Sequence, residues 1–552
     1  MTDNQSYVVN DDEKPPQKET KEIEVIPDDG ALTDGGEVEY CHPLRLGLFY
    51  HKFFQGFMLA LVVSPTLTYP FFGRYLNLSG NVYNALYGSI SFVWSIKIVW
   101  ALLSDGVSIL GKYRIPYMAI GWVVACISFT LSYFIPLPEP YYGVTENCTR
   151  NETHINNPDA EKGAWPFIVL LVFILMIFGM ADVASDGLSV VYARREPIER
   201  RGKATTYCTV MEVVGISFIS FAAAILQNSG EYGGQFCFSI SYNQLLLSYG
   251  VISAFGIINS LTLTKEPIIE KKRNVKENLK QFWNLMGTEA FLRVSYFTLF
   301  NTMCSGMRSA AIVKINSIWI DLSPFVTGLI GMLAICIVIC SMIVYERVFV
   351  NFSWRLALTI CYLIIYPLGF LGEVLAIFDI VRNQYLNFFD DVINSTPRAV
   401  TTFVQLQLAT EISQEGNEGI VFGMIMTLTG LSQPITSMLS NLISAPFNVV
   451  GDERYLRDSM NDRLNVFYTV FIAFSFNCCS LILVNTLMPN QKKHVQEIRE
   501  NKAQYTKLRA FFIVFIIFAV ICAYVSNTLA IIPSTSCLAI AGGSGCNSTS
   551  TE

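Results

Sequence analysis

The fold of this chain is decided by one stretch, WPFIVLLVFILMIFGMADVASDGLSVVYAR, at residues 165–194. Residues 165–181 contain no charged side chain, and about 20 apolar residues in a helix cross the roughly 30 Å of bilayer hydrocarbon. Asp182 and Asp186 then interrupt the same apolar run. A charge inside the bilayer costs at least about 2.5–3.5 kcal/mol, so we expect both carboxylates to face polar partners within a bundle of membrane helices.

Apolar runs of similar length occur on both sides of this stretch. Hydrophobic residues make up 52% of the 552 residues and charged residues only 15%, whereas soluble domains carry about 25% charged residues. The pattern therefore predicts an all-α membrane protein. The predicted spans are 53–73, 82–103, 115–136, 165–190, 204–227, 242–264, 290–318, 325–345, 354–379, 386–411, 419–446, 465–488 and 510–532.

The spans divide into two sets of six, with a thirteenth appended. Paired bundles of this kind are typical of transporters, which bind substrate between the two repeats. Residues 1–40 hold twelve acidic residues against three Lys, a composition typical of disorder. The predicted organisation is a disordered acidic cytosolic tail (1–45), a six-helix bundle (46–264), a cytosolic linker (265–289), a second six-helix bundle (290–488), a basic cytosolic segment (489–509), the extra helix (510–532) and an outer tail (533–552).

The orientation follows from the distribution of Lys and Arg between the loops. With the N-terminus inside, the inner segments hold 24 of these residues and the outer segments hold 7, as the positive-inside rule requires. Four glycosylation sequons are then outside, at Asn77, Asn147, Asn151 and Asn547. Four cysteines are outside as well, and an oxidising space would allow two disulfides among them: Cys148, Cys237, Cys537 and Cys546.

Two inner loops repeat an acid and an arginine at the same spacing. Asp105 precedes Arg114 by nine residues, and Glu346 precedes Arg355 by nine. We expect each pair to act as a gate, because its members can bind each other or helix ends when the inner side is closed and separate when it opens. The alternative, two solvated loop charges, applies above all to the second pair.

These motifs carry a resemblance to a known family. Asp105 with GKYR (111–114) and the segment EPIERRG (196–202) resemble inner loops of the major facilitator superfamily. More narrowly, WSIK (94–97), SDG (104–106), ADVASDG (181–187) and EGNEG (415–419) look like the folate–biopterin transporter family. The resemblance spans about 50–490 and implies the major facilitator fold and transport of a folate- or biopterin-like anion. Residues 1–45 and the thirteenth span lie outside the family pattern.

Charged residues within the predicted spans are candidates for the transport site. They include Lys97, Asp182, Asp186, Glu212, Arg308, Glu373 and Arg398. We expect a polar cavity between the halves, in which Asp182 and Glu212 titrate protons. Arg308 and Arg398 would hold an anionic substrate there, because guanidinium binds carboxylates through two parallel hydrogen bonds. In the alternative reading, Lys97 and Asp186 form a fixed structural ion pair, and Lys314, Asp390 and Asp391 lie at the membrane interface.

The functional hypothesis is a proton-coupled secondary active transporter that works by alternating access. Two alternatives stay open: a major facilitator transporter of another solute, and a transport-inactive membrane sensor or scaffold. No phosphate-binding GxxxxGK[ST] loop appears, which disfavours ATP-driven transport. We expect no enzymatic activity, cofactor, metal or nucleic-acid partner. The expected partners are a small-molecule substrate, protons and lipid, and the expected transporter is a monomer in the plasma membrane rather than an internal one.

Overall fold

The structure is a computed structural model, and it describes residues 31–33, 47–78, 96–145, 148, 150–234, 236–266, 275–320, 324–349, 352–414, 416–447, 449, 452–501, 503–531, 535 and 538. Several predicted features fall outside these ranges. They are most of the acidic tail, the first part of the second span (82–95), the sequons at Asn147 and Asn547, and Cys537 and Cys546.

The first half of the chain forms a bundle of apolar helices. Its first membrane segment is bent by 53° where α1 gives way to α2 and η1. Pro65 and Pro70 each begin a new helical piece there, because proline has no N–H to donate to the preceding turn. The elements are α1 (Gly47–Val63), α2 (Pro65–Tyr69), η1 (Pro70–Tyr75), α4 (Lys97–Gly106), α5 (Ile115–Ser132), α6 (Trp165–Arg194), α7 (Lys203–Leu226) and α8 (Tyr242–Thr262).

The second half also forms a bundle of helices, and one of its predicted spans is interrupted. The span predicted at 290–318 is not one helix, because α10 ends at Ser305 and helical structure resumes only at Ala311. The elements are α10 (Glu289–Ser305), α11 (Ala311–Lys314), η4 (Ile315–Trp319), α12 (Pro324–Val344), η5 (Tyr345–Phe349), α13 (Trp354–Ile377), α14 (Gln384–Ile412), α15 (Glu418–Ser444), η6 (Ala445–Phe447), α16 (Asp452–Arg457) and α17 (Met460–Leu487).

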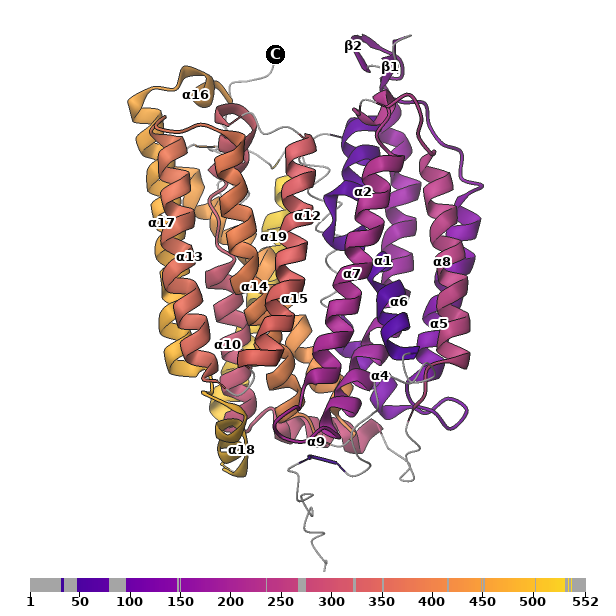
Figure 1. Ribbon diagram of the computed structural model, residues 1–552, viewed down its shortest axis with the longest axis vertical. Coiled ribbons are helices and arrows are strands. Elements are labelled where there is room, and N and C mark those ends of the chain that lie inside the picture. Colours follow the sequence, from indigo (N-terminus) through magenta and orange to yellow (C-terminus); the bar gives the residue numbers. More distant parts are fainter. Residues whose placement is uncertain are drawn as a thin grey trace, which may run out of the picture.

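The two halves lie side by side, with α4 and α6 of the first half packed on α15 and with α7 packed on α12 (Figure 1). One apolar core lies within the first half, and the core of the second half extends to Ala101, Val183 and Val210 of α4, α6 and α7. Within the described residues, nine helices are long and apolar enough to cross a membrane, or ten if the bent first segment is one span. The mostly helical membrane architecture is thus as predicted, while the thirteen crossings stay a prediction.

Three helices lie outside the two bundles. The linker helix α9 (Val275–Leu285) lies across one end of the molecule, and α18 (Lys492–Glu500) lies at that same end (Figure 1). We call this the inner end. The apolar helix α19 (Thr506–Ile531) begins four residues before the predicted extra span and packs against α15. Its Phe512 ring lies 4.6 Å from the ring of Tyr296 on α10.

A small hairpin marks the opposite, outer end. Strand β1 (Tyr142–Val144) pairs antiparallel with β2 (Arg150–Ile155) (Figure 1). The turn between them holds Cys148, which forms a disulfide with Cys237 in the loop between α7 and α8. The short helices η2 (Ala160–Ala164) and η3 (Gly230–Tyr232) complete this end. The disulfide therefore joins two outer loops of the first half.

Candidate functional site

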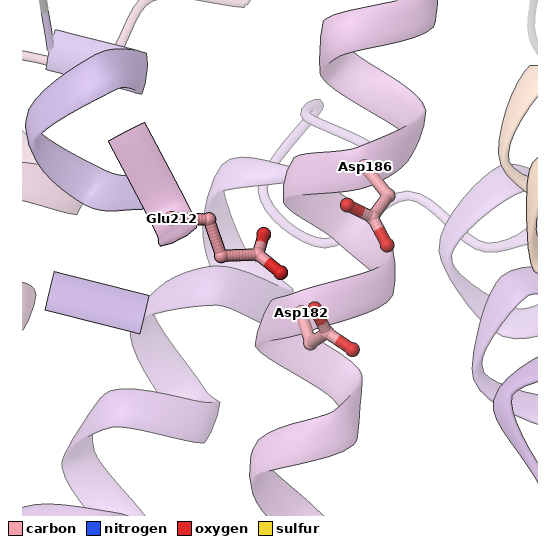
Figure 2. Close-up of side chains that lie close together, drawn as sticks. All are labelled: Asp182, Asp186 and Glu212. Carbon is pink, nitrogen blue, oxygen red and sulfur yellow. The ribbon is translucent and has the colours of Figure 1, made fainter. Parts of the chain in front are cut away.

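Three carboxylates converge inside the first half. Asp182 and Asp186 lie one turn apart on α6, and Glu212 reaches toward them from α7 (Figure 2). One oxygen of each group lies within 4.8 Å of the others. The side chains of Asp182 and Asp186 are buried. We call these three residues the carboxylate cluster.

Two lysines supply positive charge to the carboxylate cluster. Lys52 on α1 contacts Asp186 and lies 3.1 Å from Glu212, while Lys97 on α4 contacts Asp182 and lies 3.7 Å from Asp186. Both lysines are buried. With all five groups ionised, two positive charges face three negative ones, which gives a net charge of −1. The spacing of the three carboxylates would suit a cation, and the two lysine ammonium groups are the cations that they bind here.

Sequence reasoning missed Lys52 and simplified the pairing of Lys97. The predicted first span began at residue 53 and left Lys52 in the inner segment, but α1 begins at Gly47 and carries Lys52 into the bundle. The apolar residues Leu48 and Phe49 before it were the available signal. The expected pair of Lys97 with Asp186 exists, but Asp182 is the closer partner.

Close packing of α1 on α7 brings Lys52 and Glu212 together. A Cβ at Gly56 would lie 2.1 Å from the Glu212 carbonyl oxygen, and a Cβ at Gly215 would lie 2.1 Å from that of Phe53. Only glycine permits this approach, as at other tight contacts between membrane helices. The two glycines thus set the distance between the lysine on one helix and the carboxylate on the other.

A buried amide completes the polar shell around the cluster. Gln55, on α1, donates a hydrogen bond to Asp182 and lies 3.3 Å from Glu212. The hydroxyl of Ser185 donates to the Gln55 side-chain oxygen at 2.7 Å, which orients the amide with its NH₂ group toward the acids. The cluster is therefore held by donors on α1 and α4, and Ser185 of α6 orients one of them.

The second half contains a cavity of about 520 Å³. Arg308, Glu373 and Arg398 are its charged lining residues, and both arginines are exposed. With these groups ionised, two positive charges and one negative charge give the wall a net charge of +1. The other lining residues are polar or aromatic for the most part, and they include Thr302, Tyr362, Tyr366, Phe370, Thr401, Gln405, Gln433, Phe474 and Asn477.

Hydrogen bonds and ring contacts fix the aromatic wall of this cavity. The Tyr362 hydroxyl lies 2.9 Å from Thr401 Oγ1 and accepts a bond from Asn301 at 3.1 Å. The Phe370 and Phe474 rings stack with centroids 4.4 Å apart. Because these contacts fix the side chains, the wall presents preformed ring surfaces to a ligand.

The predicted polar cavity between the halves stays a prediction. All the residues that line the described cavity belong to the second half, between Thr302 and Asn477, and neither Asp182 nor Glu212 is among them. The arginines and the acids instead form two separate groups, one in each half. The sequence shows that these charges lie within predicted spans but could not place them laterally, because that depends on which helix faces which.

At the inner end, the first predicted gate pair bridges the two halves. Arg114 forms ion pairs with Asp105 at 2.9 Å and with Glu418 of α15 at 3.2 Å. The second Asp105 oxygen accepts a hydrogen bond from the Ile420 backbone N–H at 2.8 Å. Gly419 lies so close that a Cβ there would be 2.8 Å from the same carboxylate. Asp105 therefore holds the first turn of α15 against α4.

A second bridge at the inner end involves the segment that resembles the superfamily. Arg201 pairs with Glu411 of α14 at 2.7 Å, with both side chains fully buried. Lys492 of α18 donates to the Arg201 carbonyl oxygen at 2.6 Å, and burial lowers the pKa of Lys492 to about 8. Glu196 accepts hydrogen bonds from the backbone N–H groups that begin α7, among them that of Gly202 at 2.7 Å. These contacts keep the inner ends of the halves together.

The second predicted gate pair behaves differently. Arg355 donates to the Met488 carbonyl oxygen at 2.5 Å, just beyond the end of α17. Within the part of the chain that the structure describes, Glu346 and Arg355 form no ion pair with each other. Of the two partners expected for Arg355, the structure shows the helix end. The two loops therefore share a spacing but not a contact pattern.

The comparisons with known proteins agree with the motifs. Residues 55–139 match the model of the BT1 family. The chain is 20% identical over 430 residues to "Folate transporter 1" of Plasmodium falciparum (isolate 3D7), an alignment that covers 75% of this chain and 74% of the relative. These relatives are transporters rather than enzymes.

Solved structures show the same fold. The major facilitator proton:xylose symporter XylE, bound to 6-bromo-6-deoxy-D-glucose, matches with a TM-score of 0.54 at 14% identity, covering 84% of this chain and 98% of that one. Another structure of a D-xylose–proton symporter matches with a TM-score of 0.53 at 12% identity, covering 83% of this chain and 99% of that one. The chain is therefore an integral multi-pass membrane transporter with the major facilitator fold, and its sequence similarity is to the folate–biopterin transporters.

Proposed function

We propose that this chain transports folate- or pterin-like organic anions and couples their movement to protons. The observation that carries the proposal is the cavity of the second half, where Arg308 and Arg398 lie among tyrosine and phenylalanine rings. Guanidinium groups bind carboxylates, and the rings suit a flat heterocycle. The cavity volume of about 520 Å³ is within the range of about 300–1,000 Å³ found for ligand sites. The curated relative, a folate transporter, supports the same substrate class.

The carboxylate cluster supplies the proposed coupling. Its net charge of −1 becomes zero when one proton binds, and a neutral cluster costs less to enclose among apolar helices. Desolvation favours the protonated carboxyl, whereas the nearby ammonium groups of Lys52 and Lys97 favour the ionised one. A helix movement that changes the desolvation of the cluster or its distance from the two ammonium groups would therefore make the cluster take up or release a proton. We assign this titration to Asp182 and Glu212, with Asp186 held by Lys52.

In the proposed function, the ion pairs at the inner end control alternating access to the two sides of the membrane. Arg114 and Arg201 join the halves at the inner end through Glu418 and Glu411, so the proposed cycle opens the inner side by breaking these pairs. Neutralising the cluster would weaken the hold of α6 on its neighbours and favour that change. A monomer contains every part of this cycle.

The coupling is tested by Asp182→Asn in proteoliposomes that contain the purified full-length chain. With labelled folate or biopterin and an imposed pH gradient, the wild-type protein should accumulate substrate against its concentration gradient. The variant should lose that accumulation and keep exchange of internal for external substrate, because the amide cannot titrate. Asp159→Asn changes an exposed acid outside the cluster and should behave as wild type.

Two results would redirect the proposal. Accumulation by Asp182→Asn with the wild-type pH dependence would remove the coupling role. Transport of another solute in place of folates and pterins would favour the alternative substrate, and binding without transport of any solute would favour a sensor.

A further inference from the structure

The linker helix α9 has one face on the protein and one exposed face that the proposed transport cycle does not use. The buried residues recur every three or four positions and are Asn278, Phe282 and Leu285. The opposite face is exposed and carries two lysines and two apolar side chains, namely Lys276, Leu279, Lys280 and Trp283. Lysine together with tryptophan on one exposed face is typical of a helix at the boundary between membrane and water.

The start of α19 adds a cation to this exposed face. The Tyr505 N–H donates to the Gly287 carbonyl oxygen at 2.9 Å, which brings the chain back to the end of α9. Arg509, in the first turn of α19, lies over the Trp283 ring, 4.3 Å from its centroid. It also donates to the Trp283 carbonyl oxygen at 2.7 Å. We define the α9–α19 surface by four side chains: Leu279, Lys280, Trp283 and Arg509.

The α9–α19 surface lies where α19 would enter the membrane. This helix is long and apolar enough to cross a membrane from Thr506 onward, and such a crossing puts its first turn at the inner edge of the hydrocarbon. The helix α9 lies across the same end of the molecule (Figure 1). At this level tryptophan rings lie among the lipid headgroups, and lysine and arginine side chains reach the phosphates. The surface therefore faces the headgroups of the inner leaflet.

The buried face of α9 lies against the gate pair of Asp105 and Arg114. The Asn278 side chain donates hydrogen bonds to the carbonyl oxygens of Asp105 at 3.0 Å and Gly416 at 3.4 Å. Asp105 is near the end of α4 in the first half, and Gly416 precedes α15 in the second half. One side chain of α9 thus binds both halves, close to where Arg114 joins them.

We propose that the α9–α19 surface binds an anionic phospholipid of the inner leaflet, and that Asn278 couples this binding to closure of the inner end. The two cations, Lys280 and Arg509, attract the charged headgroup, and the two apolar side chains contact the acyl chains. A lipid bound there holds α9 in place, so the hydrogen bonds from Asn278 to both halves persist. Zwitterionic lipids bind more weakly. This inference holds whatever solute the protein carries.

Lipid binding to the purified full-length protein tests the surface. Native mass spectrometry compares the affinities of dioleoyl phosphatidylserine and dioleoyl phosphatidylcholine, which have the same chains. Each Lys or Arg near an anionic headgroup contributes about fivefold in affinity, so the wild-type protein should prefer the serine lipid by about 30-fold. In Lys280→Gln/Arg509→Gln the preference should fall below about threefold. Lys280→Gln alone should lower it by about fivefold, which keeps the test valid if the double variant does not fold.

A matched control removes the same number of charges from the inner end. Lys265 and Lys493 are exposed there but lie outside the α9–α19 surface. The variant Lys265→Gln/Lys493→Gln should keep the wild-type preference for the serine lipid. The chain-free headgroup glycerophosphoserine should not compete with the lipid, because it lacks the acyl chains that Leu279 and Trp283 contact.

Hydrogen exchange in nanodiscs tests the coupling to the inner end. The Ile420 amide, which donates to the Asp105 carboxylate, reports opening there. In wild-type protein it should exchange about fivefold more slowly when the bilayer contains phosphatidylserine than when it is phosphatidylcholine alone. Asn278→Ala should bind the serine lipid as the wild-type protein does and should lose this slowing.

Each contrary outcome overturns a stated part of the inference. Equal affinities of the wild-type protein for the two lipids would remove the lipid surface, and so would a double variant that keeps the wild-type preference. Equal losses in the double variant and its control would show attraction by net charge alone, and competition by glycerophosphoserine would show an anion site without a lipid role. Slowing of exchange that persists in Asn278→Ala would overturn the coupling. These measurements use no transported solute, so they stand apart from any failure of the proposed substrate class.

Discussion

The two halves of the transporter hold their charges in opposite ways. In the first half, the carboxylate cluster is buried, and Lys52 and Lys97 contact its members directly. In the second half, Arg308 and Arg398 are exposed along a cavity. Buried groups suit a change of proton occupancy, whereas exposed groups on a cavity wall suit a ligand that arrives and leaves. The proposed function therefore has coupling in the first half and binding in the second.

The largest effect is expected for Lys52→Met, which tests whether pairing holds the first half together. Removing one partner of a buried ion pair costs about 3–5 kcal/mol, because the other charge stays buried. We expect a large fall in the thermal stability of the purified protein. Adding Glu212→Gln should restore part of it, since the cluster then returns to a net charge of −1. Lys162→Met, at an exposed pair, is the control, and an unchanged melting temperature for Lys52→Met would remove the contrast between the halves.

The next effect concerns Asp105, whose contacts join the halves. Asp105→Asn should lose the ion pair to Arg114 and weaken the hydrogen bond from the Ile420 N–H. The free energy that holds the two halves together at the inner end should then fall by about 1.5–3 kcal/mol. Hydrogen exchange at the Ile420 amide should become faster, and transport should slow while the protein stays folded. Wild-type exchange and transport in this variant would show that Asp105 is not needed to hold the inner end together.

Arg398→Lys sharpens the assignment of binding to the second half. Lysine keeps the charge but loses the flat fork of donors, so we expect affinity for a folate or pterin carboxylate to fall by about tenfold, or about 1.4 kcal/mol. The dependence of accumulation on the pH gradient should stay as in wild type. Arg457→Lys, at an exposed outer residue, should change neither quantity. A variant that alters pH dependence and not affinity would place coupling in the second half.

The smallest effect is expected at the outer end, where paired charges are half-exposed. Asp458 binds Arg463 and Arg382, each at 2.7 Å, and these guanidinium groups lower its pKa. Because the folded pKa is below the unfolded value of about 3.9, the stabilisation is present above about pH 4 and is lost as the pH falls further. Asp458→Asn should cost about 1 kcal/mol or less at neutral pH. Melting temperatures at pH 6 and pH 3 measure this, and an equal cost at both would contradict it.

Sequence reasoning found most of the residues that the structure brings together. Asp182, Asp186, Glu212 and Lys97 were recognisable because charges are rare within apolar runs. The pair of Asp105 and Arg114 was recognisable from spacing and from resemblance. Lys52 was not, because a lysine at the edge of an apolar run looks like a loop residue until the start of the helix is known. Gln55 gave no signal, since an uncharged amide costs too little in a membrane helix to stand out.

The amino-acid sequence alone predicts a helical membrane protein, because an apolar run of this length satisfies its backbone hydrogen bonds in a bilayer only as a helix. It also indicates which side chains need partners, because the cost of a charge in hydrocarbon depends on depth along one helix. The identity of those partners depends on how the helices pack in three dimensions. The lateral packing of helices, set by contacts such as Gly56 against α7, placed the acids beside lysines in one half and the arginines along a cavity in the other.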